Sequence, residues 1–426
     1  MNTIPPQEDL VTLELPFGHS HISLELPSSN LLSVLLPRDG ERAREESALV
    51  RQALAHPIGT PRLRDLARPG QKVVIITSDL TRPCPSDRLL PPLLQELAVA
   101  GVPDADITIV VALGLHRPMS ESELETTVGS DVYRRVRVVN HDPGNTVRLG
   151  STSFGTPVEI YRPVVEADLR VCLGNLELHY FVGYSGGAKA ILPGCASRAT
   201  VTANHAMMAR PEAAAGRLEG NPVRADIEEG VAMLGVDFIL NVMLDGEKRI
   251  LGAVAGEVSA AHRRGCALVA QRAEVTIRER ADIVVVSAGG YPKDVNLYQA
   301  QKALENATHA ARAGGIIVWV AECAEGYGNP TFETWMREMG SPDELLERIQ
   351  GEFVLGGHKA AAIAAVLKRN RVYLVSGLQP EAVRWCNLTP FDNLGEAMQT
   401  AFGEIGRDAR VIVMPHGGSI LPTVMS

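Results

Sequence analysis

Three short polar segments hold side chains that could transfer protons or bind an anion, and each segment directly follows a predicted strand. The first runs from Ser78 to Pro83 and contains Asp79, Thr81 and Arg82. A carboxylate, a hydroxyl and a guanidinium in this order suit a ribose, a phosphate or a carboxylate, because arginine binds such oxyanions through two parallel hydrogen bonds. A polar turn closed by an Asp–Arg pair has the same composition, so spacing alone leaves both interpretations open.

The second segment, Gly114 to Ser120, carries His116 between a predicted strand and a predicted helix. Histidine is the side chain best suited to acid–base catalysis near neutral pH, and a strand end is a common place for it. A loop histidine that caps the following helix is the alternative. Ser120 and Glu123 match the pattern of a capping box, which predicts a helix start at this point.

The third segment, Gly174 to Gly194, is the richest in polar and glycine residues and contains His179, Gly186, Gly187 and Lys189. Paired glycines allow close backbone approach and predict N–H groups available for an anion, while the lysine is a candidate charge clamp or point of covalent attachment. The patterns GxxxxGK[ST] and GxGxxG are both absent, so neither a Walker-type NTPase nor a dinucleotide site is predicted.

Two further groups lie on predicted helices. His205, next to Asn204, is a candidate metal ligand, although a lone helical histidine is more often structural. Tyr298, Gln299 and Lys302 are three and four residues apart, which places their polar tips on one helix face; a solvated surface would show the same spacing.

The elements that position these residues follow an α/β pattern, in which short β-branched runs alternate with longer amphipathic stretches. This predicts two α/β domains with largely parallel sheets, divided within the charged stretch 271–282 into residues 1–275 and 276–404. Predicted strands are 72–77, 106–113, 169–173, 237–244, 282–287, 315–320, 371–376 and 410–414. Predicted helices are 86–100, 120–128, 197–210, 222–234, 259–271, 295–312, 341–350, 357–369 and 392–404.

Composition narrows the function classes. The chain has 426 residues, a net charge of −9 and 4% aromatic residues, which disfavours nucleic acids and anionic membranes as partners. No apolar run approaches the roughly 20 residues of a membrane span, and the N-terminus lacks the basic start of a signal peptide. The six cysteines have no paired spacing, as expected of reduced thiols in a cytoplasmic protein.

Taken in order, five motifs resemble those of the nickel-dependent lactate racemase family, over about residues 70 to 420. Each motif is weakly specific alone, but five in sequence make a strong match. They are D-x-T-R-P (79–83), G-x-H-R (114–117), HYFxGYSGGxK (179–189), NH (204–205) and YPKDxNLYQAxK (291–302). The sequence departs from the family at GGHKA (356–360), where a substrate-side aromatic residue is expected.

The resemblance implies a cofactor, pyridinium-3,5-bisthiocarboxylic acid mononucleotide, whose two sulfur substituents and ring carbon hold nickel as a pincer. It implies a covalent tether from this nucleotide to Lys189 and a further nickel ligand at His205. Asp79 and Thr81 would hold the ribose and phosphate. The family fold places the active site between two α/β domains and returns the tail, 405–426, to the first domain.

The resemblance also assigns the residues that act on substrate. His116 and His179 would be the catalytic acid–base pair. Arg82 and Lys302 would bind the substrate carboxylate and stabilise the intermediate. Tyr298 and Gln299 would lie beside them. A small-molecule 2-hydroxy acid is therefore the expected ligand, and the enzymes that make the cofactor are the expected transient partners.

The implied reaction is racemisation or epimerisation at C2 of a 2-hydroxy acid by proton-coupled hydride transfer through a planar 2-keto acid. Removing hydride avoids a second negative charge beside the carboxylate, and one base per enantiomer explains two histidines. The motifs address only the 2-hydroxycarboxylate head, so lactate, malate, phenyllactate, longer aliphatic acids and sugar acids stay open as substrates. A nicotinamide-dependent dehydrogenase, disfavoured without GxGxxG, and a non-catalytic cofactor carrier are the alternatives.

Overall fold

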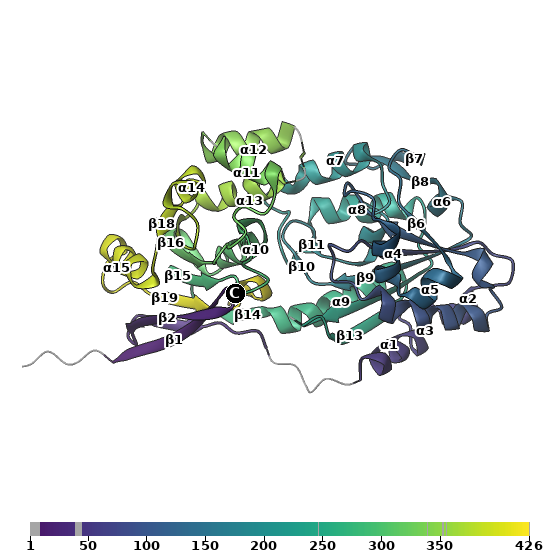
Figure 1. Cartoon of the computed structure of the whole chain (residues 1–426), viewed down its shortest axis with the longest axis horizontal. Coiled ribbons are helices and arrows are strands. Elements are labelled where there is room, and N and C mark those ends of the chain that lie inside the picture. Colours follow the sequence, from purple (N-terminus) through teal and green to yellow (C-terminus); the bar gives the residue numbers. More distant parts are fainter. Residues whose placement is uncertain are drawn as a thin grey trace, which may run out of the picture. The chain divides into compact units, whose positions relative to one another are not determined.

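The chain forms two compact units, both of the α/β class (Figure 1). The computed structural model describes residues 9–38, 45–245, 247–338, 340–351, 353–354 and 356–425. The terminal unit combines residues 1–39 with 272–426, and the inserted unit covers residues 40–271. Each unit contains a six-stranded sheet whose neighbouring strands are largely parallel, so the predicted fold class is confirmed.

The inserted unit is built on a sheet with the strand order β13-β12-β9-β4-β5-β6. Only the edge pair β12–β13 is antiparallel. Its strands are β4 (Val73–Ser78), β5 (Ile107–Ala112), β6 (Arg137–Asn140), β9 (Leu169–Leu176), β12 (Phe238–Leu244) and β13 (Ile250–Gly256). Short pairs lie beside this sheet: β7 (Thr146–Ser151) with β8 (Pro157–Tyr161), and β10 (Leu178–His179) with β11 (Gly183–Tyr184).

Helices cover both faces of this sheet, which explains why its strands are apolar throughout. Val73 and Ile75 of β4 face one buried cluster, while Val74 and Ile76 face another, as the two-residue repeat of a strand requires. The helices are α1 (Glu46–Ala55), α2 (Leu63–Leu66), α3 (Ser86–Val99), α4 (Glu121–Val128), α5 (Ser130–Arg135), α6 (Arg162–Val165), α7 (Arg198–Ala206), α8 (Pro222–Ala232) and α9 (Val258–Ala273). Helix α4 begins with the predicted capping box of Ser120 and Glu123.

The terminal unit has a second sheet, in the all-parallel order β18-β17-β16-β15-β19-β3. Its strands are β3 (Leu31–Val34), β15 (Ala281–Ser287), β16 (Ala311–Val320), β17 (Arg371–Val375), β18 (Thr389–Phe391) and β19 (Val411–Met414). Its helices are α10 (Leu297–Ala307), α11 (Pro330–Arg337), α12 (Pro342–Gly351), α13 (Gly357–Leu367), α14 (Pro380–Trp385) and α15 (Leu394–Ile405).

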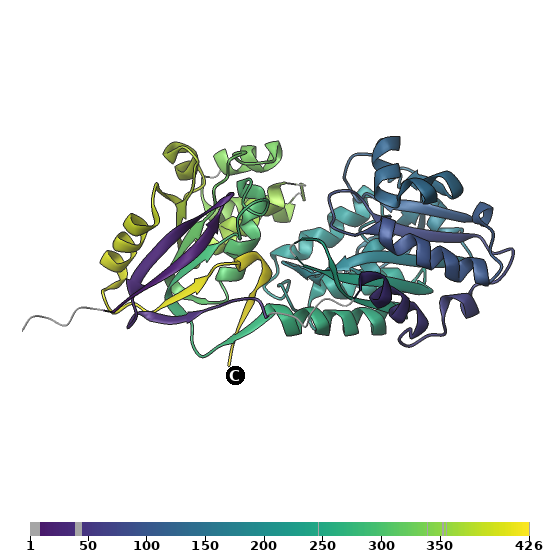
Figure 2. The same ribbon diagram turned by 60° about the horizontal axis from the view of Figure 1, so that its bottom comes forward.

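An N-terminal hairpin of β1 (Leu10–Phe17) and β2 (Ser20–Pro27) packs on one face of the terminal sheet beside α15 (Figure 2). Leu15 and Leu24 alternate with exposed neighbours and lie in the same buried cluster as Val285 and Leu394. The hairpin is therefore amphipathic, with a period of two residues.

The structure differs from the predicted domain limits in both end segments. The tail was expected to join the domain that contains residues 1–275, but β19 pairs with β15 and β3, and β20 (Leu421–Val424) pairs with β14 (Glu274–Ile277). The N-terminal strands likewise belong to the terminal unit. The physical reason is that β19 is apolar on both faces and fills the place between β15 and β3, where both of its sides are hydrogen-bonded. None of the described helices is long and apolar enough to cross a membrane.

Two buried histidines make the stability of the inserted unit depend on pH. His141 and His262 are each 2% exposed, and burial lowers the pKa of His141 to about 4 and that of His262 to about 3. Unfolding restores an ordinary pKa of about 6.5, so between these values the unfolded chain binds more protons than the folded chain.

We therefore expect the free energy of unfolding to fall as the pH is lowered from 6.5 toward 4.5, by about 1.4 kcal/mol per pH unit for each histidine. Urea unfolding followed by far-UV circular dichroism measures this. Trp319, Trp335 and Trp385 all lie in the terminal unit, so tryptophan fluorescence follows that unit separately; burial also lowers the pKa of His309 there to about 4, so its stability should fall with pH as well. His141→Phe should remove about half of the slope, and an unchanged slope would contradict the assignment.

Candidate active site

The three polar segments come together because β9, β4 and β5 are neighbours in one parallel sheet. Their carboxyl ends lie at the same edge, which is where open α/β sheets bind ligands. A backbone hydrogen bond from the Gly114 N–H to the Gly194 carbonyl, 2.9 Å long, ties the second segment to the end of the third. The structure thus joins residues that lie about a hundred positions apart in the sequence.

Asp79 and His116 form a hydrogen-bonded pair at this edge. The His116 Nδ1–H donates to Asp79 Oδ2 at 2.9 Å, and the Thr81 N–H donates to Asp79 Oδ1 at 2.7 Å. The Thr81 hydroxyl donates to the same Oδ1. Because Nδ1 carries the proton, the ring of His116 has its lone pair on Nε2, the atom that a general base uses.

The carboxyl group of Asp79 is ionised in this pair. Asp79 is 5% exposed. Burial alone would raise its pKa, but the hydrogen bonds from His116 and Thr81 outweigh burial and hold the pKa below its usual value. A fixed negative charge therefore lies behind the ring of His116, where it favours the imidazolium that forms when the ring accepts a proton.

Phe181 links three of the other predicted residues. Its ring lies edge-on to His179 at 4.7 Å and to His205 at 5.0 Å, measured between ring centroids. The Lys189 Nζ lies 5.8 Å from the centroid of the same ring. His179, Lys189 and His205 therefore surround one buried aromatic side chain.

Lys189 has an unusual electrostatic setting. No described residue forms an ion pair with its amine. Burial, together with the guanidinium groups of Arg224 and Arg82, holds the pKa of Lys189 well below its usual value. An amine in this setting is unprotonated, and so nucleophilic, at a lower pH than an ordinary lysine. Arg82 itself is exposed.

The ring of His205 is oriented by a chain of buried polar groups. Its Nδ1–H donates to Asn204 Oδ1 at 3.0 Å, and the Asn204 amide donates to Asp226 Oδ2 at 2.7 Å. Asn204 and Asp226 are fully buried. This chain assigns the proton to Nδ1, so Nε2 is the ring nitrogen that carries the lone pair; polar groups behind the ring commonly orient metal-binding histidines in this way. Within the described ranges, no group of three or more His, Cys, Asp or Glu side chains could hold a metal ion.

The sequence predicted that the glycine pair would leave N–H groups available for an anion. The structure shows that one of these groups is already used within the protein. The Gly187 N–H donates to Asn241 Oδ1 at 2.8 Å, in a buried contact. The backbone is also held through the Ser185 carbonyl, which accepts from His262 Nε2–H at 2.9 Å. The loop that leads to Lys189 is therefore bound to the protein interior.

In the terminal unit, α10 carries Tyr298, Gln299 and Lys302. Gln299 is exposed, and its N–H donates to the helix-capping side chain of Asn296 at 3.0 Å. The Tyr298 ring has Lys359 Nζ above it, 5.4 Å from the ring centroid, and His358 edge-on at 6.3 Å. The GGHKA segment thus contacts the predicted tyrosine, and His358 Nδ1 accepts from the Gly356 N–H at 3.1 Å.

A cysteine nucleophile is disfavoured by the surroundings of the thiols. Burial raises the pKa of Cys84, the cysteine nearest in sequence to Asp79, to about 11. Burial likewise raises the pKa of Cys172 and Cys266 to about 12. The reactive thiolate is therefore scarce at neutral pH.

Sequence reasoning missed Phe181, Asn241 and Asp226 as contributors to this site. Asn241 had a readable signal, because it is the only polar residue in the apolar strand FILNVML. A buried amide in such a strand needs hydrogen-bond partners, and a neighbouring loop commonly supplies them. Phe181 lies inside the HYFxGYSGGxK motif but was not assigned a role, and Asp226, within a predicted helix, gave no such signal.

Two family models match the chain, the lactate racemase N-terminal domain over residues 17–216 and the lactate racemase C-terminal domain over residues 276–422. The lactate racemase of Thermoanaerobacterium thermosaccharolyticum is 36% identical over 97% of this chain and 99% of its own length. That of Lactiplantibacillus plantarum is 33% identical over 97% of this chain and 100% of its own length.

The structure agrees with these sequence relationships. The lactate racemase apoprotein from T. thermosaccharolyticum superposes with a TM-score of 0.89, over 97% of this chain and 100% of that chain. A Thermotoga maritima protein that is 19% identical gives a TM-score of 0.61 and shares the fold alone. The chain belongs to the lactate racemase family and is, like the relatives that give the family its name, a racemase.

Proposed function

We propose that the protein interconverts the enantiomers of lactate, or of a closely related 2-hydroxy acid, with a nickel-pincer nucleotide attached to Lys189. The observation that carries the proposal is the arrangement around Phe181, whose ring has near it both an amine of lowered pKa, that of Lys189, and the imidazole of His205, whose Nδ1–H donates to Asn204. The first suits a covalent tether and the second suits a single metal bond.

The donor set fits a metal that arrives with most of its own ligands. His205 offers one imidazole nitrogen, and a thiocarboxylate-bearing pyridinium would add two sulfurs and one carbon. Four such donors make the roughly square-planar set that nickel prefers. When bound, the cofactor supplies the hydride acceptor, and the residues of this chain supply binding, orientation and proton transfer.

His116 is the better defined of the two proposed bases. Its Nε2 accepts the proton of the substrate hydroxyl, and the Asp79 carboxylate behind the ring stabilises the resulting imidazolium. His179 is proposed to accept the hydroxyl proton of the opposite enantiomer. The cofactor contacts predicted for Asp79 and Thr81 stay predictions. The hydrogen bond from His116 gives Asp79 a second proposed role, which is to orient that ring.

Arg82 and Lys302 are proposed to bind the substrate carboxylate and the developing oxyanion. A guanidinium can hold the carboxylate through two hydrogen bonds, which fixes the direction of the C2–H bond. Tyr298 and Gln299 are proposed neighbours on α10. The assignment of Lys302, Tyr298 and Gln299 rests on the family resemblance alone.

The first experiment tests the attachment. Protein from cells that express the pincer-nucleotide biosynthesis enzymes should carry a sulfur-containing nucleotide on the peptide with Lys189 and about one nickel per chain. Lys189→Arg should carry neither, because arginine keeps the charge and lacks a nucleophilic amine, whereas Lys248→Arg at an exposed lysine should load normally. An unmodified Lys189 in cells that load a related racemase would overturn the proposal.

The second experiment tests the two bases. With cofactor loaded, His116→Gln and His179→Gln should each lose about 10²-fold or more in racemisation of lactate, measured by chiral chromatography. Because enantiomers have equal free energies, kcat/KM must fall equally in both directions. Trapping of the 2-keto acid in a rapid quench should then show that each variant still oxidises one enantiomer, and that the two variants retain opposite ones. Near wild-type racemisation in both variants would contradict the scheme.

The third experiment tests Asp79. Thr81 and His116 donate to different oxygens of Asp79, and in Asp79→Asn one of these oxygens becomes an amide nitrogen, so the ring of His116 loses its anion or changes its tautomer. We expect a loss of about 10²-fold in racemisation and a changed ¹⁵N signal of the His116 ring. Asp131→Asn, at an acidic side chain that is 89% exposed, is the matched control. An unchanged ¹⁵N spectrum with full activity would remove Asp79 from the mechanism.

Lactate is the proposed substrate because the relatives from T. thermosaccharolyticum and L. plantarum are lactate racemases. A panel of 2-hydroxy acids, including malate and phenyllactate, separates lactate from the other substrates that share its head group. Addition of NAD with lactate should give no reduced-nicotinamide absorbance, and its appearance would favour the dehydrogenase alternative.

A further inference from the structure

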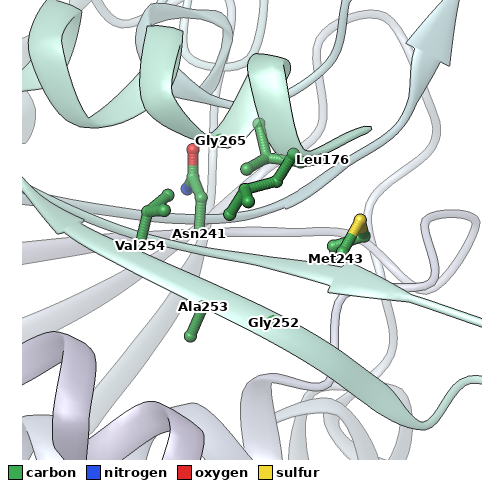
Figure 3. Close-up of a pocket in the computed structure, with 8 residues that line it drawn as sticks. Leu176, Asn241, Met243, Gly252, Ala253, Val254 and Gly265 are labelled. Atoms are coloured by element: carbon green, nitrogen blue, oxygen red, sulfur yellow. The ribbon is translucent and has the colours of Figure 1, made fainter. Parts of the chain in front are cut away.

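The loop that carries Lys189 rests on two buried side chains outside the predicted motifs. Asn241 is 1% exposed and lies in the middle of β12, opposite Gly174 of β9. In Figure 3 its amide rises from the strand beside Leu176 and Gly265. Its Oδ1 accepts from the Gly187 N–H at 2.8 Å. His262, on α9, donates from Nε2 to the Ser185 carbonyl at 2.9 Å.

These two contacts explain why the loop contains two glycines. A Cβ added at Gly186 would lie 2.7 Å from Asn241 Oδ1, and one added at Gly187 would lie 2.7 Å from His262 Cδ2. Both glycines also have positive φ angles, of 76° and 60°. The backbone therefore packs directly on the two side chains, at a distance that no other residue type permits.

Ser185 is fixed from its other side as well. Its hydroxyl donates to the Asn175 carbonyl at 2.7 Å and accepts from the Glu177 N–H at 2.9 Å. The turn Gly187–Ala190 follows at once, and the Lys189 N–H donates to the Gly186 carbonyl at 3.3 Å. The direction in which Lys189 leaves the backbone is thus set by the residues that hold Ser185 and Gly187.

Both supporting side chains are electrically neutral. Burial, together with the nearby Arg224 guanidinium, lowers the pKa of His262 to about 3, so the ring carries no charge at neutral pH. The sulfur of Cys266 lies 3.6 Å from the ring's Nδ1 and 3.5 Å from the ring's Nε2. Neutral supports hold the loop without adding a charge beside an amine that already lies near Arg224 and Arg82.

We infer that Asn241 and His262 are positioning residues for Lys189, which fix the Ser185–Lys189 backbone so that the amine meets the nucleotide in one orientation. The geometry of this inference comes from the contacts above. Its consequence, an effect on cofactor attachment, rests on the proposed function. Simple core packing is the alternative, and it predicts that only stability depends on these two side chains.

The test compares variants that remove each hydrogen bond with one that keeps it. His262→Leu removes the donor, whereas His262→Gln places an amide nitrogen the same number of bonds from the backbone. Asn241→Leu removes the acceptor. Asn370→Leu is the control, because Asn370 is a buried amide of the terminal unit that donates to the Arg312 carbonyl at 2.8 Å and does not contact the loop.

Two readouts are measured on the full chain. After coexpression with the pincer-nucleotide biosynthesis enzymes, intact mass gives the fraction of chains that carry the nucleotide. We expect His262→Leu and Asn241→Leu to load about ten-fold less than wild type, and His262→Gln and Asn370→Leu to load normally. In the unloaded protein, hydrogen exchange of the peptide 183–192 should be about ten-fold faster in His262→Leu and Asn241→Leu than in wild type. It should be unchanged in His262→Gln and Asn370→Leu.

The outcomes separate this inference from the proposed function. Normal loading of folded His262→Leu and Asn241→Leu, as judged by thermal unfolding, would overturn the positioning role. If wild type itself does not load in cells that load a related racemase, the proposed function fails. The exchange measurement then still tests whether the two side chains hold the loop. Unchanged exchange in His262→Leu and Asn241→Leu would overturn the positioning role as well.

Discussion

The adjacency of β9, β4 and β5 in one parallel sheet is the constraint on which the site depends. Parallel strands end at the same edge, and strand ends leave backbone groups and short loops that can turn toward a ligand. Asp79, His116 and His179 follow these strands and so emerge at one edge. A single register shift in this sheet would move the histidines relative to each other. The three strands are largely buried and each is paired on both sides, which fixes the register.

Positively charged side chains lie around Lys189 at this edge of the sheet, although the chain as a whole is acidic. The whole chain carries −9, yet the neighbourhood of Lys189 contains the guanidinium groups of Arg82 and Arg224, opposed there by Glu177. Asp79 is committed to His116 and cannot neutralise them. A locally positive site on an acidic protein attracts a carboxylate or a phosphate by short-range contacts rather than by a long-range field.

The sequence predicted the parts of the fold that periodicity determines. All eight predicted strands exist, because each is a short apolar run in a sheet that other elements cover on both faces. The hairpin β1–β2 was missed, since its alternating pattern contains Pro16 and the surface that it packs on begins only at Ile283, far along the chain. The placement of the tail failed for a related reason: the apolar run of β19 suits either sheet, and only the gap between β15 and β3 decides.

The side chains of the proposed site are of two kinds. Those proposed to touch reactants or the cofactor are polar side chains at strand ends, such as His116, or on helices, such as His205 and Lys302, and motifs in the sequence reveal them. Residues that orient them, such as Asp226 behind Asn204 and His262 beneath Ser185, lie in the middle of helices, where a polar side chain is ordinary. Their partners are brought together only by tertiary packing, so no spacing rule could pair them.

Chain order also separates the proposed tasks. Lys189, His205 and the side chains that orient them all lie in the inserted unit, whose sheet is complete once residue 256 has been made. The terminal sheet, in contrast, needs β3 and β19, from opposite ends of the chain. Contacts between such distant segments form late, because the long intervening loop must first be closed. The groups that would hold the cofactor are therefore organised by contacts within the inserted unit, which is one continuous stretch of chain, and the helix with Lys302 belongs to a unit that the last strands complete.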